Sequence, residues 1–278
     1  MSGMKIQECE IKSLEGRIYA KTWIPENRSS EVPIVLLHDS LGCVELWRDF
    51  PEVLAQNLSR RVIAYDRLGF GKSDARLDLP GFNFIEEEAI KYFPVVKREL
   101  SLTQYVLCGH SVGGAMAIHI AARDAQCVAV ITMAAQAFVE DLTVAGIMEA
   151  KQAFNLPEQI ERLERWHGQK AQWVLRAWTE IWLAAGFSGW SLEDSIGKVI
   201  CPVLAIHGDR DEYGSTAFPE FIAGKAGGVS ELLVLPNCGH MPHKEKPEEV
   251  IAAVKRFLKS NLPVAAAKKG RRLGVEHL

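Results

Sequence analysis

The residues 109–113 have the types and spacing of a nucleophile held on a sharp turn. Their sequence, Gly-His-Ser-Val-Gly, fits the pattern G-x-S-x-G and lies between a strand-like apolar run and a helical pattern. A serine on such a turn is strained and exposed, and small flanking residues let other chain segments approach it. The helix that follows offers backbone N–H groups to a developing negative charge. We therefore expect Ser111 to act as a nucleophile.

A serine nucleophile needs a histidine to take its proton and a carboxylate to orient that histidine. Among the eight histidines, His240 follows the last strand-like run, which places its loop at the same edge of the sheet as Ser111. The run 208–212, Gly-Asp-Arg-Asp-Glu, follows the preceding strand-like run and offers three acids. We choose Asp211 as the orienting carboxylate.

The elements that must position these residues alternate between short β-branched runs and longer amphipathic stretches. Strands are predicted over 33–39, 61–66, 104–109, 127–134, 202–208 and 231–236, and helices over 47–58, 85–100, 112–123 and 248–260. This order predicts a parallel sheet that helices cover on both faces. The run 5–25 alternates around Glu15-Gly16 and predicts an antiparallel hairpin at one edge of the sheet.

The alternation stops in residues 135–198, which read as helical and hold five of the seven tryptophans. A helical insertion between two strands of an open sheet lies over the carboxyl ends of the strands, where ligands bind in such folds. We therefore predict that residues 1–134 and 199–262 form the core and that 135–198 form a cap. Residues 263–278 lack apolar periodicity and are predicted to be a flexible tail.

From about Ile11 to Leu262 the chain resembles a capped α/β-hydrolase. The run 239–247, Gly-His-Met-Pro-His-Lys-Glu-Lys-Pro, is similar to that family's terminal pattern, whose first histidine is the base. The family's acid usually lies three residues after a strand-ending glycine, which favours Asp211, and its Ser, Asp, His order is matched. The run 65–74 is similar to a structural turn of the family. The resemblance implies a mostly parallel, open, eight-stranded sheet with helices on both faces and an inserted helical cap.

Attack on a carbonyl creates an oxyanion that needs two N–H donors. By position these are the amide of Val112, directly after the nucleophile, and the amide of Ser40. In many relatives the loop that carries the second donor begins His-Gly, whereas here Asp39 follows His38. A carboxylate beside an oxyanion is unfavourable unless it points away or is paired. We therefore expect Asp39 to turn into its loop and to bond local backbone amides.

The wall of the substrate pocket is expected to be apolar or aromatic. Trp178 and Trp182 are four residues apart and share one helix face, and with Asp39 they are the candidate pocket residues. No arginine stands out as a carboxylate-binding residue. A solvated face is expected for the charged residues of the same segment, such as Arg162, Arg165 and Lys170.

Composition and charge disfavour several classes of protein and partner. The chain has 278 residues, 48% apolar and 24% charged, as in an average globular protein. Its formal net charge of −3 disfavours nucleic acid, and its apolar runs are shorter than the roughly 20 residues of a membrane span. Six dispersed cysteines and an N-terminus unlike a signal peptide predict reduced thiols and a cytoplasmic protein without membrane partners.

Neither a metal nor a cofactor is predicted. His240 and His243 are three residues apart, but a third ligand is missing nearby. The run 71–73, Gly-Lys-Ser, suggests a phosphate loop, yet Asp66 stands where that loop needs its first glycine.

The sequence thus predicts a serine hydrolase for an ester or thioester of a small apolar or aromatic molecule. Ser111 attacks the carbonyl, His240 takes the proton, Asp211 orients His240, and water releases the acyl group. Hydrolysis of a carbon–carbon bond and cofactor-free perhydrolysis stay open as alternatives, because related enzymes use the same three residue types. A ligand-binding member without catalysis is a further alternative. Substrate identity and oligomeric state are left open.

Overall fold

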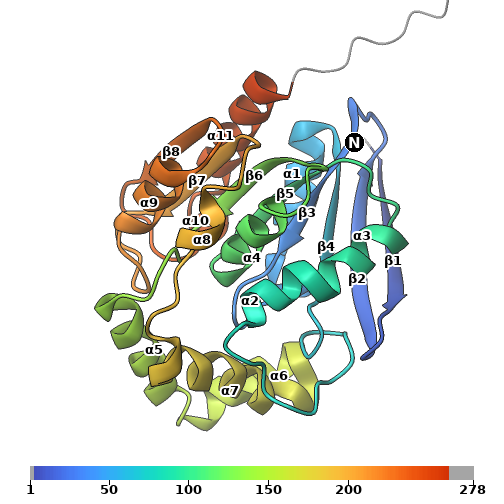
Figure 1. The fold of residues 1–278 in the computed structure, drawn as a ribbon. Coiled ribbons are helices and arrows are strands. Elements are labelled where there is room, and N and C mark those ends of the chain that lie inside the picture. Colours follow the sequence, from blue (N-terminus) through green and yellow to red (C-terminus); the bar gives the residue numbers. More distant parts are fainter. Residues whose placement is uncertain (1–2, 263–278) are drawn as a thin grey trace, which may run out of the picture.

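The computed structural model describes residues 3–262, which are built around one eight-stranded sheet (Figure 1). The strand order is β1-β2-β4-β3-β5-β6-β7-β8. The strands are β1 (Met4–Lys12), β2 (Arg17–Pro25), β3 (Ser30–Leu37), β4 (Arg60–Tyr65), β5 (Tyr105–His110), β6 (Cys127–Met133), β7 (Val203–Gly208) and β8 (Ser230–Leu235). The predicted tail, residues 263–278, lies outside the described residues.

The strand directions confirm the predicted architecture. β1 pairs antiparallel with β2, and β2 pairs antiparallel with β4, so the expected hairpin forms one edge of the sheet. The pairs from β4 through β3, β5, β6 and β7 to β8 are parallel. All parallel strands therefore end at one edge of the sheet, which is where loops can gather side chains for chemistry.

Helices cover both faces of the sheet, as predicted. The helices of the core are η1 (Val44–Trp47), α1 (Phe50–Leu58), α2 (Phe84–Glu87), η2 (Glu88–Tyr92), α3 (Phe93–Glu99), α4 (Val112–Ala121), α9 (Ala217–Lys225), α10 (Pro242–Glu245) and α11 (Pro247–Asn261). α1 and α11 contribute to one buried apolar cluster, and α3, α4 and α9 contribute to the other. Each face of the sheet thus has its own core.

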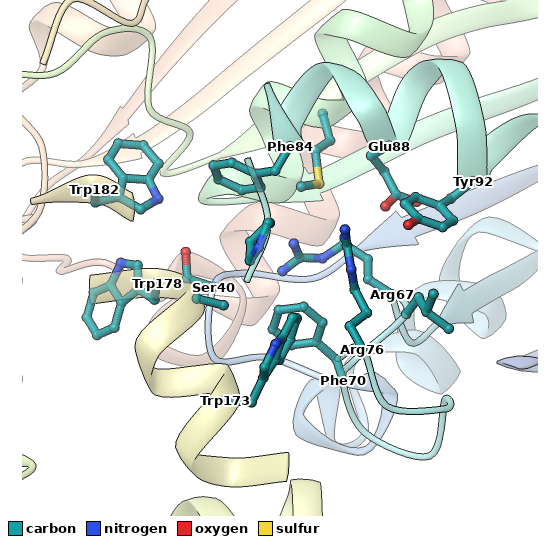
Figure 2. A pocket seen from close by; sticks show the side chains of 14 residues that line it. Ser40, Arg67, Phe70, Arg76, Phe84, Glu88, Tyr92, Trp173, Trp178 and Trp182 are labelled. Atoms are coloured by element: carbon teal, nitrogen blue, oxygen red, sulfur yellow. The ribbon is translucent and has the colours of Figure 1, made fainter. Parts of the chain in front are cut away.

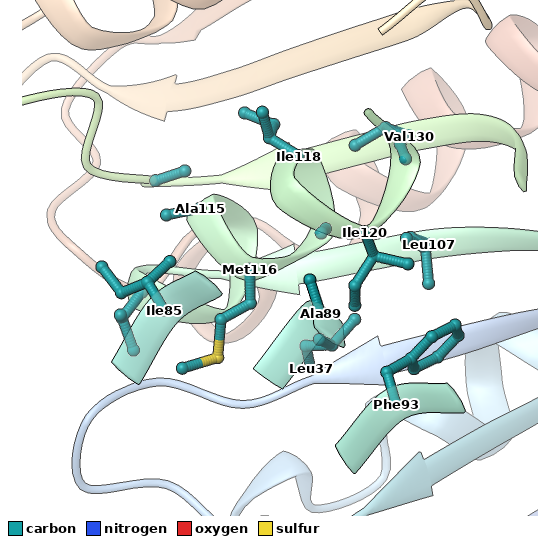
Figure 3. Close-up of a cluster of buried hydrophobic side chains, with 14 of the residues drawn as sticks. Leu37, Ile85, Ala89, Phe93, Leu107, Ala115, Met116, Ile118, Ile120 and Val130 are labelled. Carbon is teal, nitrogen blue, oxygen red and sulfur yellow. The ribbon is translucent and has the colours of Figure 1, made fainter. Parts of the chain in front are cut away.

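The helix α4 is buried over its whole length, which explains why it is apolar on all sides. Figure 3 shows Ala115, Met116 and Ile120 of α4 among side chains of the strands and of the helices before it. This packing fixes the start of α4, and with it the turn between β5 and α4.

Two predicted helices are interrupted. The stretch 85–100 is divided among α2, the π-helical turn η2 and α3, because Pro94 has no N–H for the carbonyl of Ile90. The stretch 47–58 breaks at Arg48, whose φ of 56° ends η1 before α1 begins.

Residues 135–198 lie between β6 and β7 and are mostly helical. They contain α5 (Asp141–Ala153), α6 (Pro157–His167), η3 (Gly168–Lys170), α7 (Ala171–Trp182), η4 (Ala185–Phe187) and α8 (Glu193–Ile196). α5, α6 and α7 lie together beyond one end of the sheet (Figure 1), whereas Ile196 of α8 belongs to the same apolar cluster as α4. Within residues 3–262, no helix combines the length and the apolar character that a bilayer crossing requires.

Candidate active site

Ser111 lies on a strained turn between β5 and α4. Its φ of 55° and ψ of −127° are rare for a residue with a side chain. Its N–H donates to the carbonyl of Met133 on the neighbouring strand at 2.9 Å, which helps to hold this conformation. A Cβ on Gly113 would lie 2.2 Å from Leu37 O, and one on Gly109 would lie 2.2 Å from Gly113 O. The two glycines of G-x-S-x-G are therefore required by close backbone contacts.

Asp211 and His240 meet beside this turn. Asp211 follows β7, and His240 lies in the loop between β8 and α10. Nδ1 of His240 is 2.9 and 2.8 Å from the two carboxylate oxygens of Asp211. The N–H of Tyr213 donates to Oδ1 of Asp211 at 2.8 Å, and Nε2 of His207 lies 3.3 Å from Oδ2. The Asp211 carboxylate is thus held from three sides.

The pKa values of this buried pair shift in opposite directions. Burial alone lowers the pKa of His240, but the hydrogen bond and negative charge of Asp211 outweigh it and raise that pKa above its ordinary value. Burial alone raises the pKa of Asp211, but the bond and charge of His240 outweigh it and lower that pKa. Because Asp211 occupies Nδ1, Nε2 of His240 is the ring nitrogen free to accept a proton.

Ser111 and His240 both line one cavity of about 250 Å³. Trp178 and Trp182 of α7 form part of its wall, and further side chains come from α5 and α6. Ser40 lies on the same wall. Val112 is the first residue of α4 and is buried. Val112 is not among the lining residues of the cavity, whereas the other residues predicted here gather around it at the carboxyl edge of the sheet.

The Ser111 hydroxyl donates to Oε1 of Gln136 at 3.2 Å, and no bond from Ser111 to His240 occurs in the described structure. Sequence reasoning missed Gln136. It follows β6, the strand beside β5, so its place at the carboxyl edge of a neighbouring strand is the signal that could have identified it. Because catalytic bonds are often unformed before substrate binds, a Ser111 hydroxyl turned toward Gln136 is compatible with a later turn toward His240.

A model described as the alpha/beta hydrolase family matches residues 34–253. The chain belongs to this family. Two relatives that are named as hydrolases align with most of the chain. A proline iminopeptidase of Lactobacillus crispatus is 23% identical, and the alignment covers 83% of this chain and 91% of the iminopeptidase. A pimeloyl-[acyl-carrier protein] methyl ester esterase of Nitrosospira multiformis is 25% identical, with coverages of 81% and 93%.

Solved structures of other α/β hydrolases share the fold. A proline iminopeptidase from Mycobacterium smegmatis superposes with a TM-score of 0.69 at 21% identity, and covers 92% of this chain and 98% of its own. An enol-lactonase from Burkholderia xenovorans superposes with a TM-score of 0.71 at 18% identity, with coverages of 90% and 100%. At these identities the likeness shows the fold.

Asp39 differs from the expectation for its loop. Within residues 3–262 its carboxylate accepts no hydrogen bond from a backbone amide; its Oδ1 lies 3.9 Å from Nδ1 of His110, and Asp39 lines the cavity that contains Ser111. Burial alone raises the pKa of Asp39, but His110, His38 and Lys244 outweigh it and hold that pKa below its ordinary value. The expectation of local backbone bonds is wrong, because the Asp39 carboxylate faces the His110 ring and the Lys244 ammonium instead of the amides of its own loop.

Lys170 also differs from its predicted solvated position. Its ammonium donates to the carbonyls of Gly71 and Ser73 at 2.7 and 2.5 Å, and so ties residues 135–198 to the turn after β4. Arg162 and Arg165 are exposed, as expected, although Arg162 also lines the cavity. A lysine that reaches backbone carbonyls of a distant segment leaves no local pattern in the sequence.

Proposed function

We propose that this α/β hydrolase is a serine hydrolase for an ester or thioester of a small apolar or aromatic molecule. One observation carries the proposal: the strained Ser111 and the Asp211-bound His240 line the same cavity. A nucleophile, a base and a group that orients the base are the minimum set for covalent acyl transfer. The esterase and peptidase names among the relatives agree with acyl transfer.

In the proposed reaction the Ser111 hydroxyl turns from Gln136 toward His240. Nε2 of His240 takes the hydroxyl proton as Oγ bonds to the carbonyl carbon, and Asp211 stabilises the resulting imidazolium. The amides of Ser40 and Val112 bind the oxyanion. The carbonyl re-forms, the bond to the leaving oxygen or sulfur breaks, and His240 returns the proton to that atom. Water then attacks the acyl-enzyme by the same route and releases the acid.

The lining of the cavity supports the proposed substrate class. Trp178 and Trp182 are joined there by Ile147 of α5 and Leu163 of α6. Such a wall favours apolar and aromatic groups. We further propose that residues 135–198 act as the cap of the site, since these four side chains all belong to that segment.

The proposal also includes the cellular compartment of the protein. All six cysteines are free thiols. This agrees with a reducing compartment, and we propose that the chain is a cytoplasmic enzyme.

A panel of p-nitrophenyl esters, thioesters, a prolyl amide and a vinylogous diketone tests the reaction class. We expect wild type to hydrolyse the short and aromatic esters, and Ser111→Ala and His240→Ala to lose at least about 10³-fold in kcat/KM. Ser260→Ala, at an exposed position of α11, is the matched control and keeps full activity. Turnover of the diketone alone would assign carbon–carbon bond hydrolysis, and no turnover of any member would contradict the proposal.

A further inference from the structure

A second, smaller cavity of about 30 Å³ adjoins the one that contains Ser111. The two share Ser40, Trp178 and Trp182 as lining residues, so the small cavity continues the larger one past the proposed oxyanion donor. Figure 2 shows Arg67 and Arg76 reaching into it from the turn after β4. A space of this size holds about two water-sized groups.

Arg67 is a buried cation without an ion pair. It is 5% exposed, and within residues 3–262 no carboxylate oxygen lies within 4.0 Å of its guanidinium nitrogens. Its Nη2 donates to the Asp39 carbonyl at 2.8 Å and lies 3.4 Å from Nδ1 of His38, while Nε has no hydrogen-bond partner there. Its guanidinium also lies 4.2 Å from the ring centre of Phe70. An arginine keeps its charge even when buried, so this charge calls for an anion.

The other charged groups of the small cavity already have partners. Arg76 donates to Glu87 at 3.3 Å and lies over the ring of Tyr92. Glu88 accepts a bond from the Tyr65 hydroxyl at 2.7 Å, and burial raises its pKa. Glu88 forms no ion pair with Arg67, but its negative charge and that of Asp39 partly offset the charge of Arg67 and leave the guanidinium nitrogens open to a ligand.

Trp182 gives a second, independent indication of what the cavities receive. It is 3% exposed, lines both of them, and its indole Nε1 has no hydrogen-bond partner among the described residues. The unpaired buried atoms of Arg67 and Trp182 are both N–H donors. Unpaired buried donors are destabilising, and the group that satisfies them must be an acceptor.

We propose that the small cavity binds a carboxylate of the substrate. The planar fork of Arg67 suits a carboxylate, Arg76 adds positive charge, and the two oxygens match the space available. The inference rests on the proposed function and narrows its substrate class. The substrate is an ester or thioester with a carboxylate at one end and an apolar or aromatic linker along Trp178 and Trp182.

Matched esters that differ only in the carboxylate test the proposal. Monoethyl glutarate is compared with ethyl pentanoate, and 4-(butanoyloxy)butanoate with butyl butanoate, so that the charge lies on the acyl or on the alcohol side. We expect wild type to prefer the charged member of one pair by about 10-fold or more in kcat/KM, chiefly through KM. Arg76→Gln is expected to lower that preference only in part, because Arg76 also pairs with Glu87. Arg98→Gln, a largely exposed arginine outside both cavities, keeps it.

Two further variants separate binding from a merely structural role. Arg67→Met removes the charge but also the bond to the Asp39 carbonyl; Arg67→Lys therefore accompanies it, retains the charge and is expected to keep part of the preference. Glu88→Gln removes negative charge from the cavity, and we expect it to lower KM for the charged ester. A purely structural role for these groups predicts loss of stability and an unchanged preference, which would overturn the proposal.

Calorimetric titration of Ser111→Ala with the same esters keeps the outcome independent of turnover. Binding of a charged ester that is lost in Ser111→Ala/Arg67→Met and weakened in Ser111→Ala/Arg76→Gln supports the carboxylate site. This holds even if wild type hydrolyses nothing, in which case the proposed function fails alone. Equal binding and equal turnover of charged and neutral esters in all variants overturns the carboxylate site and leaves the proposed function standing.

Discussion

Nδ1 of His240 lies within 2.9 Å of both carboxylate oxygens of Asp211. This contact joins the ends of two strands that are neighbours in the sheet, β7 and β8. It fixes which ring nitrogen carries a proton, and it leaves the other nitrogen for Ser111. The pH behaviour and the reactivity of the site follow from this pair.

In a plot of kcat/KM against pH, we expect the rise on the acid side, called the acid limb, to have its midpoint above the ordinary histidine pKa of about 6.5. His240 acts as a base only when neutral, and Asp211 raises the pKa of His240, so activity appears as pH rises through that raised value. Asp211→Asn removes the charge, moves the limb to lower pH and lowers kcat/KM by about 10³–10⁴-fold.

Asp209→Asn is the matched control for this profile. Asp209 is exposed and lies two residues before Asp211. We expect an unchanged limb and less than about a threefold change in rate, as for most surface substitutions. If Asp209→Asn were the variant that moved the limb, the assignment of the orienting carboxylate would be wrong.

Gln136→Leu is expected to raise the reactivity of Ser111. The Ser111 hydroxyl donates to Gln136 at 3.2 Å and must give up this bond to donate to His240. Loss of a competing bond worth about 1 kcal/mol corresponds to a roughly fivefold faster reaction with a fluorophosphonate. A slower reaction in a variant with the wild-type melting temperature would instead show that Gln136 holds Ser111 in its reactive position.

Asp39→Asn is expected to raise kcat for a neutral ester several-fold. The carboxylate lines the cavity that contains Ser111, where the proposed reaction forms an oxyanion, and like charges repel. Asp39 also contributes to the raised pKa of His240, so the acid limb moves to lower pH in the variant. A fall in kcat would mean that the carboxylate takes part in turnover, for example by orienting His110.

Gly113→Ala is expected to destabilise the fold by about 2 kcal/mol or more. Its Cβ would lie 2.2 Å from Leu37 O, so α4 would have to move away from β3 and take Ser111 with it. Gly224→Ala in α9 is the control, because its Cβ meets no atom within 4 Å and alanine favours a helix by about 0.5–1 kcal/mol. Urea unfolding of both variants measures the difference; equal stability would contradict the close contact.

The sequence predicted the parts of the fold and site that depend on local pattern. The strand-like runs and the G-x-S-x-G turn placed Ser111, and the last two parallel strands placed Asp211 and His240, because the ends of parallel strands meet at one edge. Two predicted helices are interrupted where the backbone departs from helical geometry. Pro94 has no N–H to donate, and Arg48 has a positive φ; apolar periodicity predicts neither departure.

Contacts between distant segments could not be read in the same way. Gln136 depends on the rotamer of Ser111, and Lys170 reaches carbonyls about a hundred residues earlier in the chain. The sequence-based expectation for the Asp39 carboxylate was wrong, because two of the groups it faces lie far away in the chain, His110 at the end of β5 and Lys244 in α10. The sequence analysis assigned Arg67 to a structural turn. That its charge lacks an ion pair can be seen only in the three-dimensional structure of the cavity.

Covalent labelling of Ser111 tests the central claim most directly. Purified protein is incubated with a small fluorophosphonate, and the adduct is located by intact and peptide mass, with Ser111→Ala, His240→Ala and Ser260→Ala alongside. An activated serine predicts one adduct per chain on Ser111, lost in the first two variants and retained in the third. Folded wild-type protein that stays unlabelled by the smallest reagents, or is labelled elsewhere, would contradict the account.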